Sequence, residues 1–224
     1  MGKIKQGILG GFANKVGTVV GSSWKGIAVM RSMPLSVANP KTTAQVANRG
    51  KFAQVVKNAQ SILSSVVQPN FNPIAKYMSG YNLFVKLNKD LIDRTTIQAY
   101  ATGMILAKGD LSCTLDAESS TVAGNVLKLA YEDTTPNAKD KSSDRIDACI
   151  VVFPKSGAEV GDVEVIHLNP TSPALGTRAN GQKEFGLPTV DVEDNYVYVL
   201  AFFRSADGKI TSNTASMRID DIME

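Results

Sequence analysis

The chain has 224 residues, of which 43% are hydrophobic and 20% charged, a composition that excludes a disordered chain and suits one large or two small folded domains. No apolar run approaches the roughly 20 residues of a membrane span, so a soluble protein without a membrane partner is expected. The net charge of +3 hides an asymmetry, because residues 1–108 hold 14 basic and two acidic side chains, and residues 109–224 hold ten basic and 19 acidic ones.

The first predicted element is a glycine-rich β-ribbon. Residues 7–32 mix β-branched residues with frequent glycines, which favours short strands and tight turns. Turns are predicted at 13–15 and at 25–26, with strands at 16–24 and 27–32. The spacing of a phosphate-binding loop is absent. A two-stranded ribbon is marginal in water on its own, so one of its faces is expected to lie against another structure.

A helical hairpin is predicted next. Thr42 and Gln45 form a capping box behind Pro40, and the helix is expected to end at Pro69. Its apolar face is predicted to hold Val55, Val56, Ala59, Ile62, Leu63, Val66 and Val67. Its opposite face is predicted to hold Lys51, Lys57, Asn58 and Ser65. A second helix is predicted from Asn72 to about Leu91, with a bend at 79–80.

Beyond about residue 102 the pattern changes to short apolar runs between polar turns, which is typical of β-structure. The predicted strands are 104–106, 110–115, 126–131, 146–153, 163–168, 183–187, 196–204 and 209–219. Asp207 and Gly208 give a hairpin signal between the last two. The predicted fold class is therefore α+β, with a basic ribbon and helical hairpin over 1–102 and an acidic antiparallel β-sandwich of immunoglobulin or fibronectin type over 103–224.

No catalytic, cofactor or metal site is predicted. The chain has one histidine, His167, and two cysteines, Cys113 and Cys149, which are expected to be reduced residues of the core. The carboxylates clustered at 191–194 and at 220–221 lack the spacing of a calcium loop, so solvated turns are the preferred interpretation. With no nucleophile and base to pair, an enzyme is not expected.

The segregated charge predicts a binding surface in the N-terminal half. The first 89 residues contain no acidic side chain, so this region should attract nucleic acid, an acidic protein or the acidic half of a second copy. The candidate interface residues are Lys15, Trp24, Lys25, Arg31, Lys41, Arg49 and Lys51. A purely solubilising role for this charge, and a core position for Trp24, are the alternatives.

The N-terminal third resembles an uncharacterised domain family of Bacteroidota and their phages. The matching text is Met1–Phe12, Lys15–Ile27, Met30–Ser32 and Asn39–Gln45 with Arg49 and Phe52. The element Asn-Pro-x-Thr-x-Ala-Gln at 39–45 is also similar to segments of phage and prophage structural-region proteins. The resemblance implies no activity, but it favours a virion component.

The leading hypothesis is therefore a phage structural protein of the neck, tail or capsid accessory region, located in the virion. It would form homo-oligomers and contact other virion proteins through its N-terminal half. One alternative is a bacterial surface or carbohydrate-binding module at the cell surface. Another is a nucleic-acid-binding protein of the bacterial cytoplasm that uses the basic half.

Overall fold

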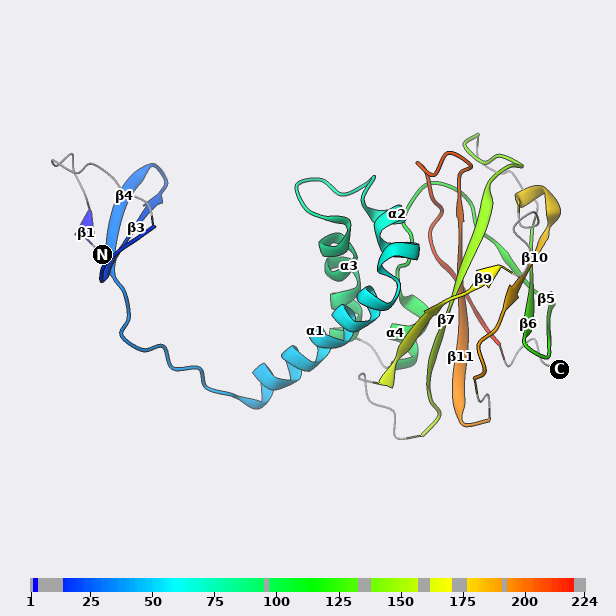
Figure 1. Ribbon diagram of the computed structural model, residues 1–224, viewed down its shortest axis with the longest axis horizontal. Coiled ribbons are helices and arrows are strands. Elements are labelled where there is room, and N and C mark those ends of the chain that lie inside the picture. Colours follow the sequence, from blue (N-terminus) through cyan, green and yellow to red (C-terminus); the bar gives the residue numbers. More distant parts are fainter. Residues whose placement is uncertain are drawn as a thin grey trace. The chain divides into compact units, whose positions relative to one another are not determined.

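The structure, a computed structural model, describes residues 2–3, 14–94, 97–132, 138–156, 162–170, 177–190 and 193–219. It confirms a mixed α+β protein whose sheets are antiparallel. Figure 1 shows the helices and strands along the chain. Two compact units are present, residues 1–43 and residues 44–224, and each is described by itself.

The first unit is a four-stranded ribbon in the order β1-β4-β3-β2. Its strands are β1 (Gly2–Lys3), β2 (Asn14–Val16), β3 (Val19–Trp24) and β4 (Ile27–Ser32). The predicted turn at Lys25 and Gly26 is confirmed, with positive φ angles of 50° and 78°. The turn predicted at 13–15 is wrong at positions 14 and 15, which lie in β2, and position 13 lies outside the described residues. The chain reverses instead at Gly17, whose φ is 57°.

The first helix begins where the capping signal predicts it. Helix α1 spans Thr43–Ser61, and a π-helical turn, η1 (Leu63–Val67), leads directly into α2 (Gln68–Phe71). The predicted stop at Pro69 is wrong because this proline lies in the first turn of α2, where its missing N–H needs no partner. The break comes earlier, at Ile62, whose φ of −114° departs from helical geometry.

The second predicted helix begins later than expected. Helix α3 spans Gly80–Arg94, so positions 79 and 80 are its start and not a bend. The Ser79 hydroxyl accepts a hydrogen bond from the Asn82 N–H, and the Asn72 side chain accepts one from the Gly80 N–H. These two oxygens satisfy N–H groups that a helix start leaves without partners. Helix α4 (Ile97–Gly103) follows.

Two four-stranded antiparallel sheets occupy the rest of the second unit, in the orders β5-β6-β10-β9 and β12-β11-β7-β8. The strands are β5 (Leu115–Ala123), β6 (Val126–Tyr131), β7 (Arg145–Pro154), β8 (Glu164–His167), β9 (Asn169–Pro170), β10 (Gln182–Gly186), β11 (Asn195–Arg204) and β12 (Ala215–Arg218). The hairpin at Gly208 is confirmed by the pairing of β11 with β12. The strand predicted at 104–106 is absent, the one at 110–115 is reduced to a bridge at Leu111, and β5 was not predicted.

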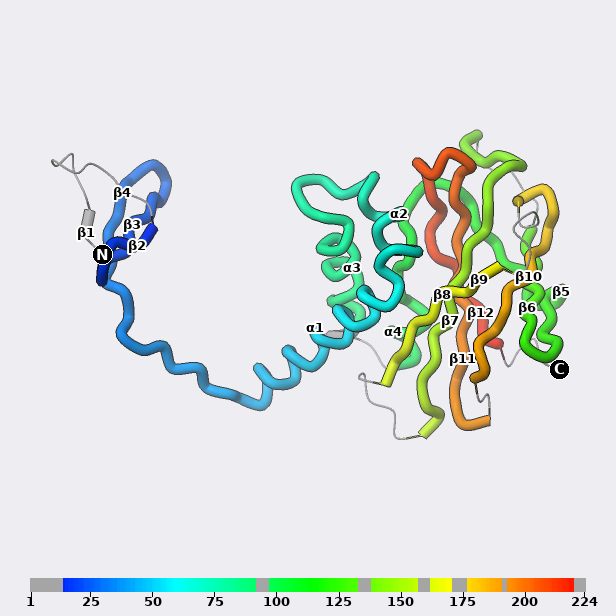
Figure 2. Tube along the Cα trace, in the orientation of Figure 1, coloured from blue at the N-terminus to red at the C-terminus, as the bar shows by residue number. Residues whose placement is uncertain are grey.

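The sheet that contains β7 and β11 is buried on both faces, with the helices on one side and the other sheet on the opposite side (Figure 1). On β7, alternate side chains divide between two hydrophobic clusters: Cys149 and Val151 pack with the helices, and Ala148 and Ile150 pack toward the second sheet. Figure 2 traces the same path along the Cα atoms. This two-sided burial explains why β11 is a nearly continuous apolar run.

The helical layer shares its core with the strands. Val55, Ile62 and Phe84 of the helices belong to the same cluster as Tyr198 and Phe202 of β11. Asn58, predicted on the polar face of α1, is instead buried and donates a hydrogen bond to the Tyr100 hydroxyl at 3.1 Å. The sequence had grouped the helices with the ribbon, whereas apolar residues of α1, η1, α2, α3 and α4 belong to the same core as the sheet of β7 and β11.

Candidate functional site

The predicted interface residues of the ribbon fall on one of its faces. Lys15 lies opposite Val20, and Val20 lies opposite Arg31, so these three side chains form a row across the strands. Trp24 lies opposite Ile27 on the same face, because it is four positions from Val20 along β3. The register therefore gives this face a basic end and an aromatic end.

Trp24 lies at the surface and not in a core, since 63% of it is exposed. The Lys25 ammonium is 5.0 Å from the centre of its ring, a cation–π contact. The five residues Lys15, Trp24, Lys25, Arg31 and Lys41 all belong to the first unit, and Lys41 lies in the non-helical segment before α1. The other two predicted residues, at positions 49 and 51, lie on α1 in the second unit.

A second candidate site, not predicted from the sequence, is a pocket of about 440 Å³ in the second unit. Four strands each contribute one basic or imidazole side chain to its lining: Arg145 from β7, His167 from β8, Lys183 from β10 and Arg204 from β11. We call it the cationic pocket. It lies in the half of the sequence that carries a net negative charge, and its lining also includes Asp147 and Asp207.

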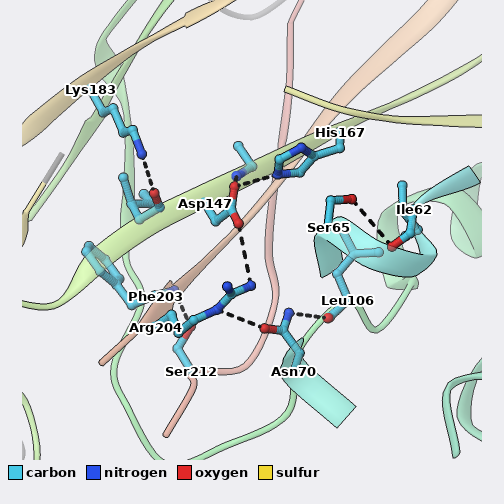
Figure 3. Close-up of polar contacts among 12 residues, drawn as sticks. Ile62, Ser65, Asn70, Leu106, Asp147, His167, Lys183, Phe203, Arg204 and Ser212 are labelled. Atoms are coloured by element: carbon cyan, nitrogen blue, oxygen red, sulfur yellow. Dashed lines mark hydrogen bonds and ion pairs between the residues drawn. The ribbon is translucent and has the colours of Figure 1, made fainter. Parts of the chain in front are cut away.

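Asp147 organises one wall of the cationic pocket. One of its carboxylate oxygens is 2.8 Å from His167 Nε2 and also accepts the Ala148 N–H at 3.0 Å. The other oxygen is 3.6 Å from Arg204 Nη2. Figure 3 shows the carboxylate between the imidazole and the guanidinium. Asp147 thus holds two side chains that the sequence separates by 37 positions.

Arg204 connects the cationic pocket to the helical layer. Its Nε donates to the Asn70 side-chain oxygen at 3.1 Å, and the Asn70 amide donates to the Leu106 carbonyl at 2.9 Å (Figure 3). Asn70 is 1% exposed, so the helix end and the strand are joined by a buried amide. Arg204 Nη2 is buried and has no hydrogen-bond partner. Its nearest printed partner is the Asp147 carboxylate, at the ion-pair distance of 3.6 Å.

Lys183 reaches the cationic pocket from the opposite sheet. Its ammonium donates to the Ile146 carbonyl at 2.8 Å (Figure 3). Burial lowers the pKa of Lys183 because desolvation disfavours the charged form; Asp147 opposes this shift and Arg145 adds to it. The charged ammonium of Lys183 is therefore destabilised at this position, and a bound anion would stabilise it.

The histidine and the two cysteines have defined surroundings in the structure. His167 bonds to a carboxylate and not to a hydroxyl or thiol. Cys113 and Cys149 are free, as predicted, and burial raises the pKa of Cys113 to about 11 and that of Cys149 well above its usual value. In the part of the chain that the structure describes, no group of three or more metal-binding side chains occurs.

The predicted carboxylate clusters are only partly described. Glu193 and Asp194 lie in the turn before β11, whereas 191 and 220–221 lie outside the described residues. None of the described helices is long and apolar enough to cross a membrane.

The sequence did not reveal the cationic pocket because its four positively charged positions lie at 145, 167, 183 and 204, each isolated in its own strand. One feature of the sequence does indicate that two of these side chains meet. Arg145 and Arg204 flank the two longest apolar runs, and antiparallel pairing of those runs places them opposite each other.

Comparison with known families gives one match. The family of unknown function DUF6266 matches residues 7–218, a range that includes β2 to β4 of the ribbon, the helices and both sheets of the second unit. No curated protein matches the chain.

Proposed function

The chain belongs to the DUF6266 family, and we propose that it is a non-enzymatic structural or assembly protein, a virion component that oligomerises and docks through its N-terminal half. The observation that carries the proposal is a continuous exposed stretch, because every residue from 30 to 50 is exposed. Within it Leu35 is 102% exposed and Val37 is 76% exposed. Apolar side chains gathered along one exposed segment mark surfaces that another molecule covers.

The charge of this region supports docking by attraction. Arg31 and Lys41 lie within the exposed stretch, and no acidic residue precedes position 90. The partner surface is therefore acidic, as the C-terminal half of another copy is. Contacts between unlike surfaces of identical chains are head-to-tail, and they close into rings when the rotation between copies permits.

We further infer that the two sheets of the second unit form a sandwich of immunoglobulin or fibronectin type. Named in chain order, the immunoglobulin strands A-B-E-D form one sheet and C-F-G the other, with C′ beside C in variable-type domains. The orders β5-β6-β10-β9 and β12-β11-β7-β8 support this assignment. The disulfide typical of antibody domains has no counterpart here, because Cys113 and Cys149 are free. Such sandwiches are used widely for adhesion and assembly, although fold alone does not determine function.

The exposed stretch provides a direct test of assembly. The double substitution Leu35→Ser and Val37→Ser removes apolar surface without touching either core, so it should leave the fold intact and weaken self-association. The matched control is Tyr77→Ser, which removes an equally exposed ring at 106% in the second unit. Sedimentation velocity of the three proteins measures the change. If all three proteins associate equally, the exposed stretch is not part of the interface.

The virion assignment requires a second measurement. Purified phage particles that encode this chain should contain it at a fixed copy number relative to the major capsid protein, as quantified by mass spectrometry. Its absence from intact particles, together with a monomeric state in solution, would refute the proposal.

A nucleic-acid-binding role is the second candidate, and one observation favours it. Lys15, Arg31 and the exposed Trp24 share one ribbon face, which would combine phosphate contacts with a stacking platform. The logarithm of the binding constant should then fall by about 0.7 per neutralised phosphate of single-stranded DNA for each unit of the logarithm of salt concentration. A fluorescence titration at several salt concentrations measures this slope, and absent or salt-insensitive binding would eliminate the candidate.

A further inference from the structure

We propose that the cationic pocket of the second unit binds the phosphate group of a small ligand. This inference is independent of the proposed assembly role, because it concerns different residues in the other unit. Three cations, Arg145, Lys183 and Arg204, line the pocket together with two carboxylates, Asp147 and Asp207. These five groups carry a net charge of +1.

The two carboxylates of the cationic pocket are already engaged by other groups. Asp147 contacts His167, Arg204 and the Ala148 N–H. Asp207 accepts hydrogen bonds from the Ser205 hydroxyl at 2.6 Å and from the Lys209 N–H at 3.2 Å. These bonds lower the pKa of Asp207, with the Ser205 bond as the largest cause, so it stays ionised. Neither acid therefore neutralises Arg145 or Lys183 by direct contact.

The donors of the cationic pocket suit a tetrahedral oxyanion. The pocket's cations come from three strands of two sheets: Arg145 from β7, Arg204 from β11 and Lys183 from β10. Arg204 is held by Asn70 at Nε and by Asp147 at Nη2, so Arg145 and Lys183 are the cations of the lining that neither carboxylate contacts directly. Single donors that converge from several directions match the oxygens of phosphate, which point along several axes.

The pocket also has the room and the position for such a ligand. Its volume of about 440 Å³ exceeds that of a bare phosphate ion, so a phosphate ester fits as well as the free ion. It lies beyond the end of the β7–β8 ladder, whose last pair is Cys149 and His167. Beyond that pair, the Leu168 N–H donates to the Ala148 carbonyl and Arg145 bridges to Thr177, so the pocket lies where the regular β7–β8 ladder has ended.

The test is a titration followed by two-dimensional amide NMR at pH 7. The full chain is titrated with sodium phosphate and, separately, with glycerol 1-phosphate, each against sodium chloride at equal ionic strength. Saturable shifts at 145–147, 167 and 204–208 with either phosphate compound are expected, and the compound that binds more tightly distinguishes free phosphate from a phosphate ester. Equal shifts with chloride, or no saturable shift with either compound, would overturn the proposal.

Variants distinguish phosphate binding in the cationic pocket from a general effect of positive surface charge. Arg145→Gln is the main variant, because this side chain is exposed and its loss leaves the fold intact; it should weaken phosphate binding about tenfold, the effect of one charge-assisted hydrogen bond. Lys183→Gln should weaken binding at least as much. The control Lys86→Gln removes the same charge from an exposed position on α3 and should change affinity by less than about twofold. Equal weakening by Lys86→Gln and Arg145→Gln would overturn the proposal.

Discussion

Replacing Arg178 by methionine should strongly destabilise the second unit. Arg178 begins the short 3₁₀ turn at 178–180 and is only 1% exposed. Its guanidinium is 3.6 Å from Asp140 and 3.7 Å from Asp144, whose side chains are both 0% exposed. It also donates to the Ser112 carbonyl at 2.7 Å and lies 4.0 Å from the centre of the Phe203 ring. One side chain thus ties the loop before β7 to the segment at Ser112 and to β11.

The size of the loss in unfolding free energy follows from the two buried carboxylates that lose their cation. Methionine fills much of the same volume but carries no charge, so Asp140 and Asp144 would remain buried without their cation. Removing one partner of a buried ion pair typically costs about 3–5 kcal/mol. The lost contact with the Phe203 ring falls within that range and is not added to it. Since small domains are stable by about 5–15 kcal/mol, much of the stability would disappear.

Urea denaturation monitored by circular dichroism measures the change in the free energy of unfolding, from the midpoint and slope. The matched control Arg145→Met removes an exposed arginine and should cost less than about 0.5 kcal/mol. Adding Asp144→Asn to the Arg178→Met variant should recover part of the loss, because one unpaired charge is removed. A cost below about 1 kcal/mol for Arg178→Met alone would refute this reasoning.

Three further outcomes are expected. Gly80→Ala should cost about 1–3 kcal/mol in urea denaturation, because the added Cβ would come within 3 Å of the Asn72 backbone N and side-chain oxygen, and an unchanged midpoint would contradict the close packing. Tyr100→Phe should cost about 1–2 kcal/mol by the same assay, since it leaves the buried Asn58 amide without this acceptor. Burial raises the pKa of Cys113 to about 11, so at pH 8 its thiol should react with a disulfide reagent well below the rate of a small free thiol and should accelerate as pH rises toward 11; reaction at the free-thiol rate would contradict its burial.

The sequence predicted the elements whose apolar pattern is long and uninterrupted. The strands β6, β7 and β11 lie within one residue of their predicted bounds, because β-branched and aromatic runs of that length have few other stable conformations. The start of α1 was also found, since capping signals are local.

Errors arose where tertiary contacts override a local signal. Asn72 and Pro73 have the appearance of a helix start, but the Asn72 side chain instead caps α3 eight residues later. Asn58 has the appearance of a surface residue, yet Gln54 and Tyr100 satisfy its polar atoms in the core. Tyr100 lies 42 positions from Asn58, and the Asn72 contact depends on the path of the loop before α3, so helix propensity alone does not find them.

The ribbon face was predicted and the cationic pocket was not, because the residues of the first lie close together in the sequence and those of the second lie far apart. The ribbon residues Lys15, Trp24 and Arg31 lie close in the sequence, so their grouping on one face follows from strand register. The cationic pocket depends on four strands of two sheets, and only the folded order β8-β7-β11 brings His167, Asp147 and Arg204 together. A buried ion cluster such as that of Arg178 is equally invisible to a sequence pattern.

The most direct test of the assembly role is the mass of the purified chain in solution, measured by light scattering at several protein concentrations and at low and high salt. Attraction between a basic half and an acidic half is screened as the Debye length falls from about 10 Å at 0.1 M salt to about 3 Å at 1 M. The predicted result is a discrete oligomer at low salt that dissociates as salt rises. A monomer of 23.9 kDa under every condition would contradict the account.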